Sequence, residues 1–343
     1  MKKTLFGLWM VGALLLCLVP AQAWSQVKEL SWGTAAVGSS GHRALVNLAN
    51  VLNREMPNYR INVLPLPGAI LTMKQYATGE IDAYYGADIG FYELANDINR
   101  FKGFKPKMKR ELVQSLWTYT VEVGVGIHAR DRERIRQWRD LSGQPVFTGP
   151  LPWDVRAHLE RAFQVLGVKH RYVNVDLATA GSALEGRTIQ AFISYTNAEA
   201  TTAPWITEAG LATDWAILNP SAEELDQLKK AGFRFVEIDP KVFRRDVRVQ
   251  KVLFSPFYYG FHVGLEIPER DAYRILTVVE EHAKELAKAD AGFAQLAQDM
   301  VGLQRRGVES SIDLVPVHPG LARYMRERGV WDPKWDGRVA KTR

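Results

Sequence analysis

Strand-like and helical segments alternate along this chain, and this alternation constrains its fold more than any other feature of the sequence. Residues 30–34 form a strand-like run, a loop of small residues follows, and apolar residues then recur at helical spacing until the helix stops before Pro57. Strand-like runs return at 60–64 and 81–85, with a helix between them. Strands that alternate with helices predict a largely parallel sheet, whose ligands lie beyond the carboxyl ends of the strands.

The second half of the chain follows the same plan. A strand-like run at 144–149 precedes a helix from 154 to 166, and further strands are predicted at 172–175 and 189–195. No close sequence repeat accompanies this plan, so the two halves are parallel in architecture only.

Two long β-type segments, 116–128 and 257–265, can cross from one half to the other. We therefore predict an α/β fold with two lobes of mostly parallel sheets and a hinge of crossing strands. The first lobe is assigned residues 27–122 and 262–343, and the second lobe is assigned residues 123–261.

The N-terminus has the parts of an export signal. Lys2 and Lys3 precede an apolar run at 5–19, and small residues ending at Ala23 match a signal-peptidase site. We predict a signal peptide at residues 1–23, cleaved near Ala23, and a periplasmic mature protein. An uncleaved anchor is the alternative, but the run is shorter than the roughly 20 apolar residues that span a bilayer.

The lone cysteine, Cys17, belongs to the predicted signal. Lipid attachment at Cys17 is disfavoured because Leu16 stands where a lipoprotein signal has a small residue. After cleavage the chain can form neither a disulfide nor a thiolate metal site. No later stretch is apolar enough to cross a membrane, so we expect no membrane insertion of the mature chain.

The formal net charge of +6 is modest for 343 residues. Basic clusters at 102–110, 130–139 and 244–251 have the composition of a nucleic-acid-binding surface. Acidic residues interrupt two of these clusters and the chain carries an export signal, so solvated faces are favoured and no nucleic-acid partner is expected. The weak basic excess is compatible with an anionic ligand.

The loop from Gly33 to His42 is the main candidate site. Its glycines allow a ligand to come close, and the first turn of the helix after it leaves N–H groups free for an anion. A simple chain reversal explains the same residues equally well. A periplasmic hydrolase that uses Ser39 or Ser40 with His42 is a further alternative, although the Gly-x-Ser-x-Gly elbow is incomplete.

Other enzyme signatures fail. The seven histidines show no H-E-x-x-H spacing, and no G-x-G-x-x-G fingerprint is present. The match of residues 181–188 to a phosphate-binding loop has Arg187 where lysine is required. We therefore expect no metal, no cofactor and no enzymatic activity.

Segments spread over the mature chain resemble the solute receptors of TAXI-type TRAP transporters. The segments are the Gly33-Thr34 loop, Gly68 with the helix and turn that end at 77–83, the strand and loop at 146–150, the turn and strand at 184–192, and the C-terminal run at 315–330. The last run is the most specific, because its His-Pro-Gly start and its Arg-Tyr pair follow the ending of that family.

The resemblance implies a type II periplasmic binding protein fold and an extracytoplasmic receptor without a cofactor. Such a receptor captures a small organic, carboxylate-like anion by lobe closure and delivers it to the membrane permease subunits of a TRAP transporter. A receptor of the same fold that signals to a sensor is the alternative.

The resemblance also implies ligand-binding residues, although the ligand loops diverge from the family. Gly33 and Thr34 match the first loop, and Ser39, Ser40 and His42 are the expected replacements for the polar contacts that the loop has lost.

Further ligand-binding residues are expected in both lobes. Gly68 and Thr72 occupy matching positions at the start of the second helix, and Trp153 would narrow the cleft or stack on a ligand. Position at strand ends adds Asp88, Tyr195 and Asn197, and Arg156 is the nearest cation to an incoming anion. A helix cap for Asp88, loop packing for Tyr195 and Asn197, and solvent exposure for Arg156 are the structural alternatives.

Overall fold

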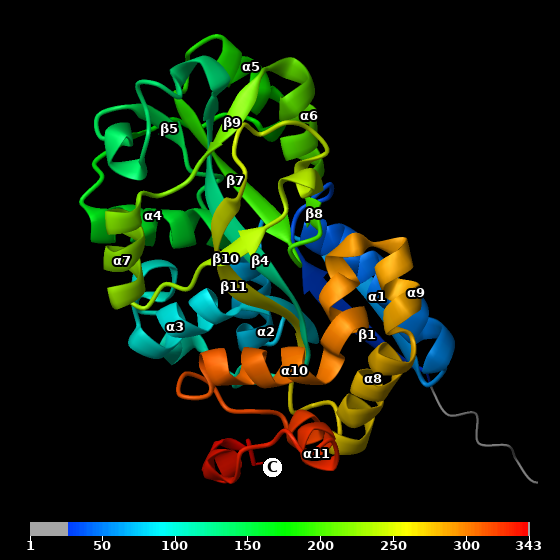
Figure 1. Cartoon of the computed structure of the whole chain (residues 1–343). Helices are drawn as coiled ribbons and strands as arrows, with labels where there is room; N and C mark the ends of the chain where they lie inside the picture. Colours follow the sequence, from blue (N-terminus) through cyan, green and yellow to red (C-terminus); the bar gives the residue numbers. More distant parts are fainter. Residues whose placement is uncertain (1–26, 342–343) are drawn as a thin grey trace, which may run out of the picture.

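One sheet of eleven strands runs through the computed structural model, which describes residues 27–341 (Figure 1). The predicted signal peptide lies outside the described residues. The main path of the sheet runs through β2 (Tyr59–Pro65), β1 (Lys28–Thr34), β3 (Ala83–Ala87), β11 (Val252–Val263), β4 (Trp117–His128), β7 (Ala191–Asn197), β5 (Pro145–Phe147) and β6 (Arg171–Tyr172). Off this path, β8 (Thr201–Thr202) pairs with β7, β9 (Trp215–Leu218) with β4, and β10 (Val236–Ile238) with β11.

The two ends of the sheet have the same internal order. In the first lobe β2, β1 and β3 are parallel, and in the second lobe β6, β5 and β7 are parallel. In each lobe the strand order is second, first, third, followed by a long strand shared with the other lobe. The predicted α/β fold of two similarly built lobes, the type II periplasmic binding protein fold, is confirmed by this topology.

The strands β4 and β11 are the predicted crossing strands. β11 pairs with β10 in the second lobe, with β4 along its middle, and with β3 in the first lobe. β4 is buried along its whole length. It pairs with β11 near its start and with β7 and β9 toward its end. Each strand is therefore continuous through both lobes, and the prediction of two crossing segments is confirmed. The residue boundaries of the lobes stay a prediction.

The directions of the strands refine the expectation of mostly parallel sheets. Parallel pairing is confined to the three outer strands of each lobe, and six of the ten pairings among the described strands are antiparallel. Five of these six pairings involve β4 or β11, because each crossing strand returns from the opposite lobe and so runs against its neighbours; the sixth joins β7 to β8.

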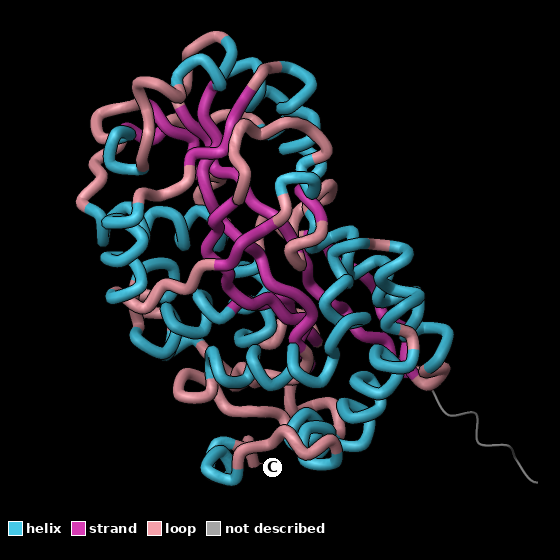
Figure 2. The backbone as a smooth tube through the Cα atoms, viewed as in Figure 1, coloured by secondary structure: helices cyan, strands magenta, loops and turns pink. Residues whose placement is uncertain are grey.

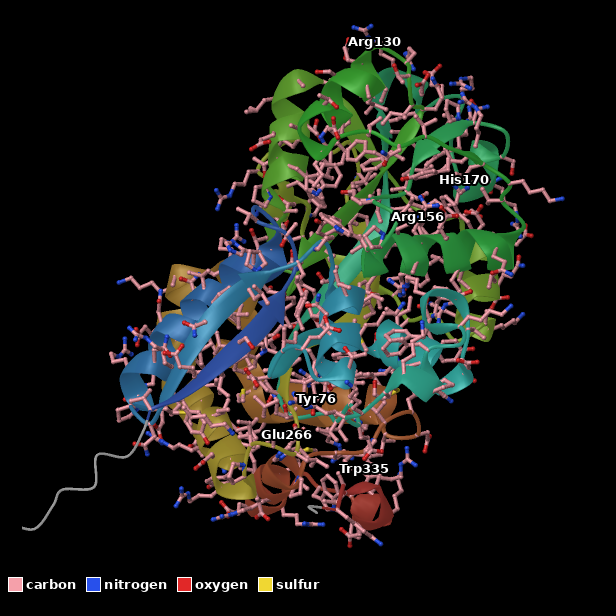
Figure 3. The ribbon with its side chains drawn as sticks, turned by 180° about the vertical axis from the view of Figure 1, so that it is seen from behind. Tyr76, Arg130, Arg156, His170, Glu266 and Trp335 are labelled. Atoms are coloured by element: carbon pink, nitrogen blue, oxygen red, sulfur yellow. The ribbon has the colours of Figure 1, made fainter. Side chains whose placement is uncertain are left out.

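Helices flank the strands on both sides (Figure 2). In the first lobe these are α1 (Ser40–Glu55), α2 (Ala69–Thr78), α3 (Asp88–Asn96), α8 (Glu269–Glu281), α9 (Ala283–Ala289), α10 (Ala294–Ser311) and α11 (Pro319–Glu327). In the second lobe these are α4 (Asp154–Leu166), α5 (Ala180–Glu185), α6 (Pro204–Ala212) and α7 (Ala222–Lys230). Seen from behind, Arg130 and Trp335 mark the two ends of the molecule, and Arg156 lies between them (Figure 3).

The sequence after Pro268 has one helical pattern of apolar residues, but the structure divides it into two helices. The apolar residues from Ala272 to Leu286 are buried on one face, and His282 leaves helical geometry at φ −105° and ψ 12°. The break separates α8 from α9 and lets both helices pack against α1. Helical periodicity continues through the break, so the sequence pattern did not reveal it.

The C-terminal run that resembles the receptor family has a structural role. The buried His318 accepts a hydrogen bond from the amide of Gly320 (3.0 Å) and so caps α11. Its other ring nitrogen lies 3.1 Å from the carbonyl oxygen of Ile267. Gly320 has no space for a side chain, because a Cβ there would lie 2.7 Å from the backbone of α8. The motif therefore fixes the contact between α11 and α8.

Residues 27–341 contain neither a membrane-spanning helix nor a metal-binding cluster. No helix in that range combines the length and the apolar character that a membrane crossing requires. The same residues hold no group of three or more histidine, cysteine or acidic side chains arranged to bind a metal ion.

Candidate functional site

A cavity of about 40 Å³ lies where the two lobes meet, beside the crossing strand β11. The loop before α1 and the end of β3 form its first-lobe wall, and the start of α4 and the end of β7 form its second-lobe wall. Six residues predicted from the sequence line it: Ser39, Ser40, Gly68, Trp153, Tyr195 and Asn197.

Three helices begin at this cavity. Ser40 in the first turn of α1, Ala69 in the first turn of α2, and Asp154 in the first turn of α4 all line it. The first turn of a helix has unpaired N–H groups, and the helix dipole adds partial positive charge there. The first turns of α1 and α2 contain no acidic residue. The ends of α1 and α2 therefore favour an anionic group in the cavity, whereas the end of α4 already carries the Asp154 carboxylate.

Three polar atoms in the cavity wall have no hydrogen-bond partner within the described chain. Oδ1 of Asp154 is one of them, and it lies 2.7 Å from Nη1 of Arg100. The other two are Oγ of Ser40 and Oδ1 of Asn197, and both are buried. Buried polar atoms in native proteins are nearly always hydrogen-bonded, so unpaired ones in a cavity wall mark positions where a ligand or water binds. The two atoms come from opposite lobes, so one small ligand can contact both.

Aromatic rings form the remaining wall. The rings of Tyr85 and Tyr259 stack with centroids 4.4 Å apart, and Tyr195 and Trp153 complete the lining. Burial raises the pKa of the Tyr85 and Tyr259 phenols well above their ordinary value, so both remain neutral. Such rings suit the apolar part of a ligand and offer no competing negative charge.

Contacts between the lobes close the cavity. The Tyr259 hydroxyl donates to Oδ2 of Asp154 (2.6 Å), and Nη1 of Arg100 lies 2.7 Å from Oδ1 of the same carboxylate. The indole of Trp153 donates to the Pro67 carbonyl oxygen (3.2 Å). Because Arg100 and Pro67 belong to the first lobe while Trp153 and Asp154 belong to the second, these contacts hold the lobes together over the cavity.

Gly33 and Thr72 serve packing rather than the cavity wall. A Cβ on Gly33 would lie 2.7 Å from Ile81 and 2.9 Å from Thr72, so glycine lets α2 approach β1. The Thr72 hydroxyl lies 2.6 Å from the Tyr85 carbonyl oxygen and accepts from the Tyr85 amide (3.1 Å). Both residues fix the position of α2 relative to β1 and β3, and so they support the cavity wall without lining it.

Thr34 and His42 flank the cavity without lining it. Thr34 is fully buried at the end of β1, and its hydroxyl has no partner among the described residues. The amide of His42 donates to Oγ of Ser39 (3.2 Å), so Ser39 is the N-cap of α1. The prediction of a strand, a loop and a helix here is confirmed, whereas a ligand role for Thr34 or His42 stays a prediction.

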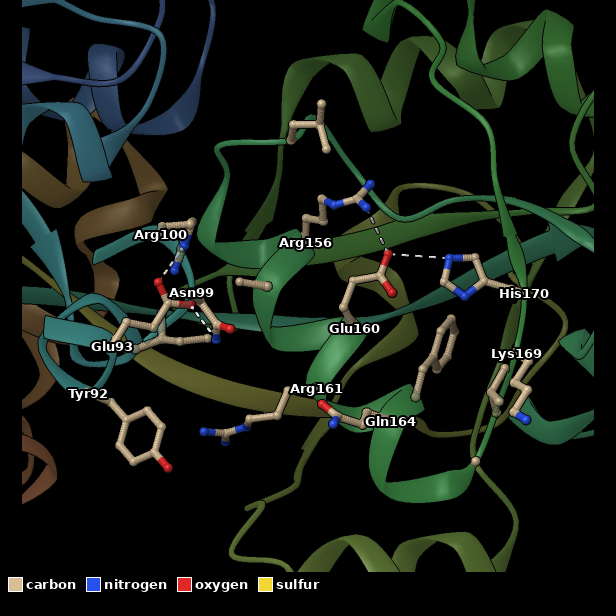
Figure 4. A pocket seen from close by; sticks show the side chains of 16 residues that line it. Tyr92, Glu93, Asn99, Arg100, Arg156, Glu160, Arg161, Gln164, Lys169 and His170 are labelled. Carbon is tan, nitrogen blue, oxygen red and sulfur yellow. Dashed lines mark hydrogen bonds and ion pairs between the residues drawn. The ribbon is translucent and has the colours of Figure 1, made fainter. Parts of the chain in front are cut away.

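Asp88 and Arg156 lie outside the cavity wall. Asp88 begins α3 and accepts from the Tyr258 amide (3.1 Å), and burial raises the pKa of its carboxyl to about 7. The Arg156 guanidinium lies 3.7 Å from the ring centroid of Tyr172 and 3.3 Å from the Glu160 carboxylate, in a separate groove along α4 (Figure 4). The sequence placed Arg156 on the correct helix, but the structure directs its side chain away from the three helix ends.

Four important residues were not predicted as site residues. Tyr85 and Tyr259 provide the stacked rings, and Asp154 and Arg100 provide the contact between the lobes. Tyr85 had a usable signal, because it lies near the carboxyl end of β3, where ligands of such sheets bind. Arg100 had none, since its partner is far away in the sequence.

Comparison with known proteins finds distant structural likeness only. No family model and no curated protein matches the sequence. The periplasmic aliphatic sulphonate binding protein SsuA from Escherichia coli is 15% identical with a TM-score of 0.43, over 88% of this chain and 90% of that chain. A putative L-cystine ABC transporter protein from Listeria monocytogenes is 11% identical with a TM-score of 0.45, over 78% and 96%. A probable amino-acid ABC transporter extracellular-binding protein from Bacillus subtilis is 12% identical with a TM-score of 0.45, over 80% and 98%. With TM-scores below 0.5, these likenesses assign neither a family nor a ligand to the chain.

Proposed function

We propose that this protein is an extracytoplasmic solute-binding receptor that captures a small organic anion by closure of its two lobes. The observation that carries the proposal is the cavity between the lobes, whose first-lobe wall includes the unpaired Ser40 hydroxyl and whose second-lobe wall includes the unpaired side-chain oxygen of Asn197. Capture by closure requires a site whose two walls come together only when the lobes meet.

The crossing strands support a hinge. β4 and β11 are continuous between the lobes, so bending at these strands can open the cavity without breaking either core. A ligand that contacts both walls binds the closed state more tightly than the open state, and it shifts the equilibrium by that difference in affinity.

The ligand chemistry follows from the wall. The ends of α1 and α2, whose first turns contain no acidic residue, favour a carboxylate or a similar anion, and the rings of Tyr85, Tyr259 and Trp153 suit a compact apolar remainder. The small volume restricts the enclosed part of the ligand to a few non-hydrogen atoms. We therefore favour a small monocarboxylate.

The delivery step is proposed from the sequence. The resemblance to TAXI-type receptors and the predicted signal peptide support export to the periplasm and delivery to a TRAP membrane permease. A neighbouring gene for a multi-span permease would support this partner, and a neighbouring gene for a sensor kinase in its place would contradict it.

Thermal unfolding with a panel of small carboxylates tests the receptor proposal. A ligand should raise the melting temperature in proportion to the logarithm of its concentration, as stabilisation follows RT ln(1 + [L]/Kd). Chemical analysis of the same mixtures should find every carboxylate unchanged. Turnover that disappears in Ser39→Ala or Ser40→Ala would instead favour the hydrolase alternative. Against that alternative, the Ser39 hydroxyl is engaged as a helix cap.

A further inference from the structure

A second and larger recess lies along α4, apart from the cavity between the helix ends. It measures about 630 Å³ and lies between α4 on one side and α3 with the short helix η1 (Asn99–Phe101) on the other (Figure 4). Four cationic side chains line it: Arg100, Arg156, Arg161 and Lys169. We call this recess the α4 groove.

Two of these cations already have carboxylate partners. Nε of Arg100 donates to Glu93 (2.7 Å), and Arg156 lies 3.3 Å from Glu160. The imidazole of His170 also lies 3.3 Å from Glu160 (Figure 4). Glu93 and Glu160 are the two carboxylate side chains that line the groove, so its cations outnumber its carboxylates by two.

Arg161 is the unusual member. It makes no ion pair within 4.0 Å with any acidic residue of the described chain, and its buried Nε has no hydrogen-bond partner there. Its guanidinium carbon lies 4.4 Å from the ring centroid of Phe233 and 6.0 Å from that of Tyr92. Aromatic faces attract a cation but leave the N–H donors of the guanidinium free.

Asp88, the acidic neighbour of Arg161, makes no ion pair with it. Asp88 lines an adjoining cavity of about 220 Å³ that Arg161 also lines, but among the described residues its carboxylate is not within 4.0 Å of the guanidinium, and its Oδ2 accepts from the Tyr258 amide. The second arginine of that cavity, Arg234, adds positive charge. A partly buried guanidinium with neither a carboxylate nor a hydrogen bond is costly to retain, and an anionic ligand removes that cost.

We infer that the α4 groove is an anion-binding site centred on Arg161, and that it takes a phosphate-type dianion, either free or as part of a small organic phosphate. The guanidinium fork matches two phosphate oxygens, and a dianion balances the excess positive charge of the groove. The partly exposed ring of Tyr92 lies beside Arg161 and can pack against an organic part. This site is separate from the solute cavity, so the inference does not rest on the proposed function.

Isothermal titration calorimetry of the purified full chain tests the inference, with orthophosphate and phenyl phosphate as probes and chloride keeping the ionic strength constant. We expect saturable binding with one site per chain. Arg161→Gln should weaken binding by about tenfold or more, since it removes a charge-assisted hydrogen-bond pair. Lys169→Gln should weaken phosphate binding by several fold, because the Lys169 ammonium contributes a point charge but not the two parallel donors of a guanidinium.

The matched control is Arg132→Gln. Arg132 is exposed, and within residues 27–341 it makes no ion pair, so the variant has the same change in net charge at a site outside the groove. It should bind both probes like the wild type. If phenyl phosphate binds more tightly than orthophosphate, and Tyr92→Leu abolishes that difference in affinity, the ligand is an organic phosphate. If the two probes bind with equal affinity, the ligand is free phosphate.

Two results would overturn the inference. One is the absence of binding for both probes. The other is an equal loss of affinity in Arg161→Gln and Arg132→Gln, which would mean that net charge alone attracts the anion. Thermal unfolding checks that Arg161→Gln is folded. If it is not, the exposed Lys169→Gln decides between the outcomes by the same comparison.

Discussion

The hydroxyl of Tyr259 donates a hydrogen bond to the carboxylate of Asp154 at 2.6 Å and so joins the crossing strand β11 to the first turn of α4. Arg100, from the other lobe, lies against the same carboxylate. Asp154 is therefore the point at which the hinge, the second lobe and the first lobe meet, directly at the edge of the cavity.

Asp154→Ala should weaken both folding and closure. It leaves a mostly buried Arg100 with Glu93 as its remaining carboxylate partner, and it removes the acceptor of Tyr259. We expect the free energy of unfolding in urea to fall by about 2–4 kcal/mol. Tyr259→Phe, which removes one donor, should lower it by about 1–2 kcal/mol. Equal losses in the two variants would show that the Arg100 contact has no energetic role.

Ser40→Ala should separate ligand binding from stability. The Ser40 hydroxyl has no partner in the described chain, so its removal should leave the melting temperature of the free protein unchanged or slightly higher. The stabilisation by a bound carboxylate should fall, with an affinity loss of about tenfold. Thermal unfolding with and without ligand measures both effects, and unchanged ligand stabilisation would argue against a role for Ser40 in binding.

Gly41→Ala should be destabilising although alanine favours helices. A Cβ at position 41 would lie 2.8 Å from the Tyr85 ring, which is held by its stack on Tyr259. We expect a loss of about 1–3 kcal/mol in the free energy of unfolding. Gly337→Ala is the control, because a Cβ there meets no atom within 4 Å, and it should change stability little. A neutral Gly41→Ala would mean that the cavity wall can relax.

Asp88 should make stability depend on pH. Burial raises the pKa of its carboxyl to about 7 in the folded protein, above the value of about 3.9 in an unfolded chain. The folded state therefore holds a proton that the unfolded state has lost, so this contribution to stability is full below about pH 4 and is lost as the pH rises to about 7. The slope is at most about 1.4 kcal/mol per pH unit.

Asp88→Asn removes that titration. The difference in unfolding free energy between wild type and Asp88→Asn should change across pH 4 to 7 and be constant above about pH 8. Urea unfolding at a series of pH values measures it. A difference that is constant over the whole range would show that Asp88 titrates normally. Glu122, whose pKa burial raises to about 8, supplies a comparison in the crossing strand β4.

Arg161→Met should not destabilise the protein when no multivalent anion is present. Arg161 has no ion pair in the described chain, and its replacement by an apolar side chain of similar length removes an uncompensated charge while keeping contact with Phe233. We expect an equal or higher melting temperature in chloride. A fall of more than about 2 kcal/mol in unfolding free energy would mean that the contacts of Arg161 with aromatic rings stabilise the fold.

Much of the fold followed from local patterns. Helical and alternating periodicities predicted α1, α2, β2, β4 and α4 close to their observed bounds, because each depends on the spacing of apolar residues within one segment. The rule that ligands lie beyond strand ends placed Tyr195 and Asn197 in the cavity wall for the same reason.

Side-chain direction and partnership between distant segments depended on the tertiary structure. The sequence alone determined that the chain alternates strands and helices in two similar halves, that two strands cross between them, and that a loop of small residues leads from the first strand to the first helix. Only the tertiary structure decided that Tyr259 stacks on Tyr85, that Arg100 reaches Asp154, and that Arg156 and Arg161 face a separate groove. Secondary structure follows from interactions within a few residues, whereas these pairings bring together residues from 54 to 174 positions apart. The stack forms when β11 pairs with β3, and the contact of Arg100 with Asp154 forms when the lobes meet.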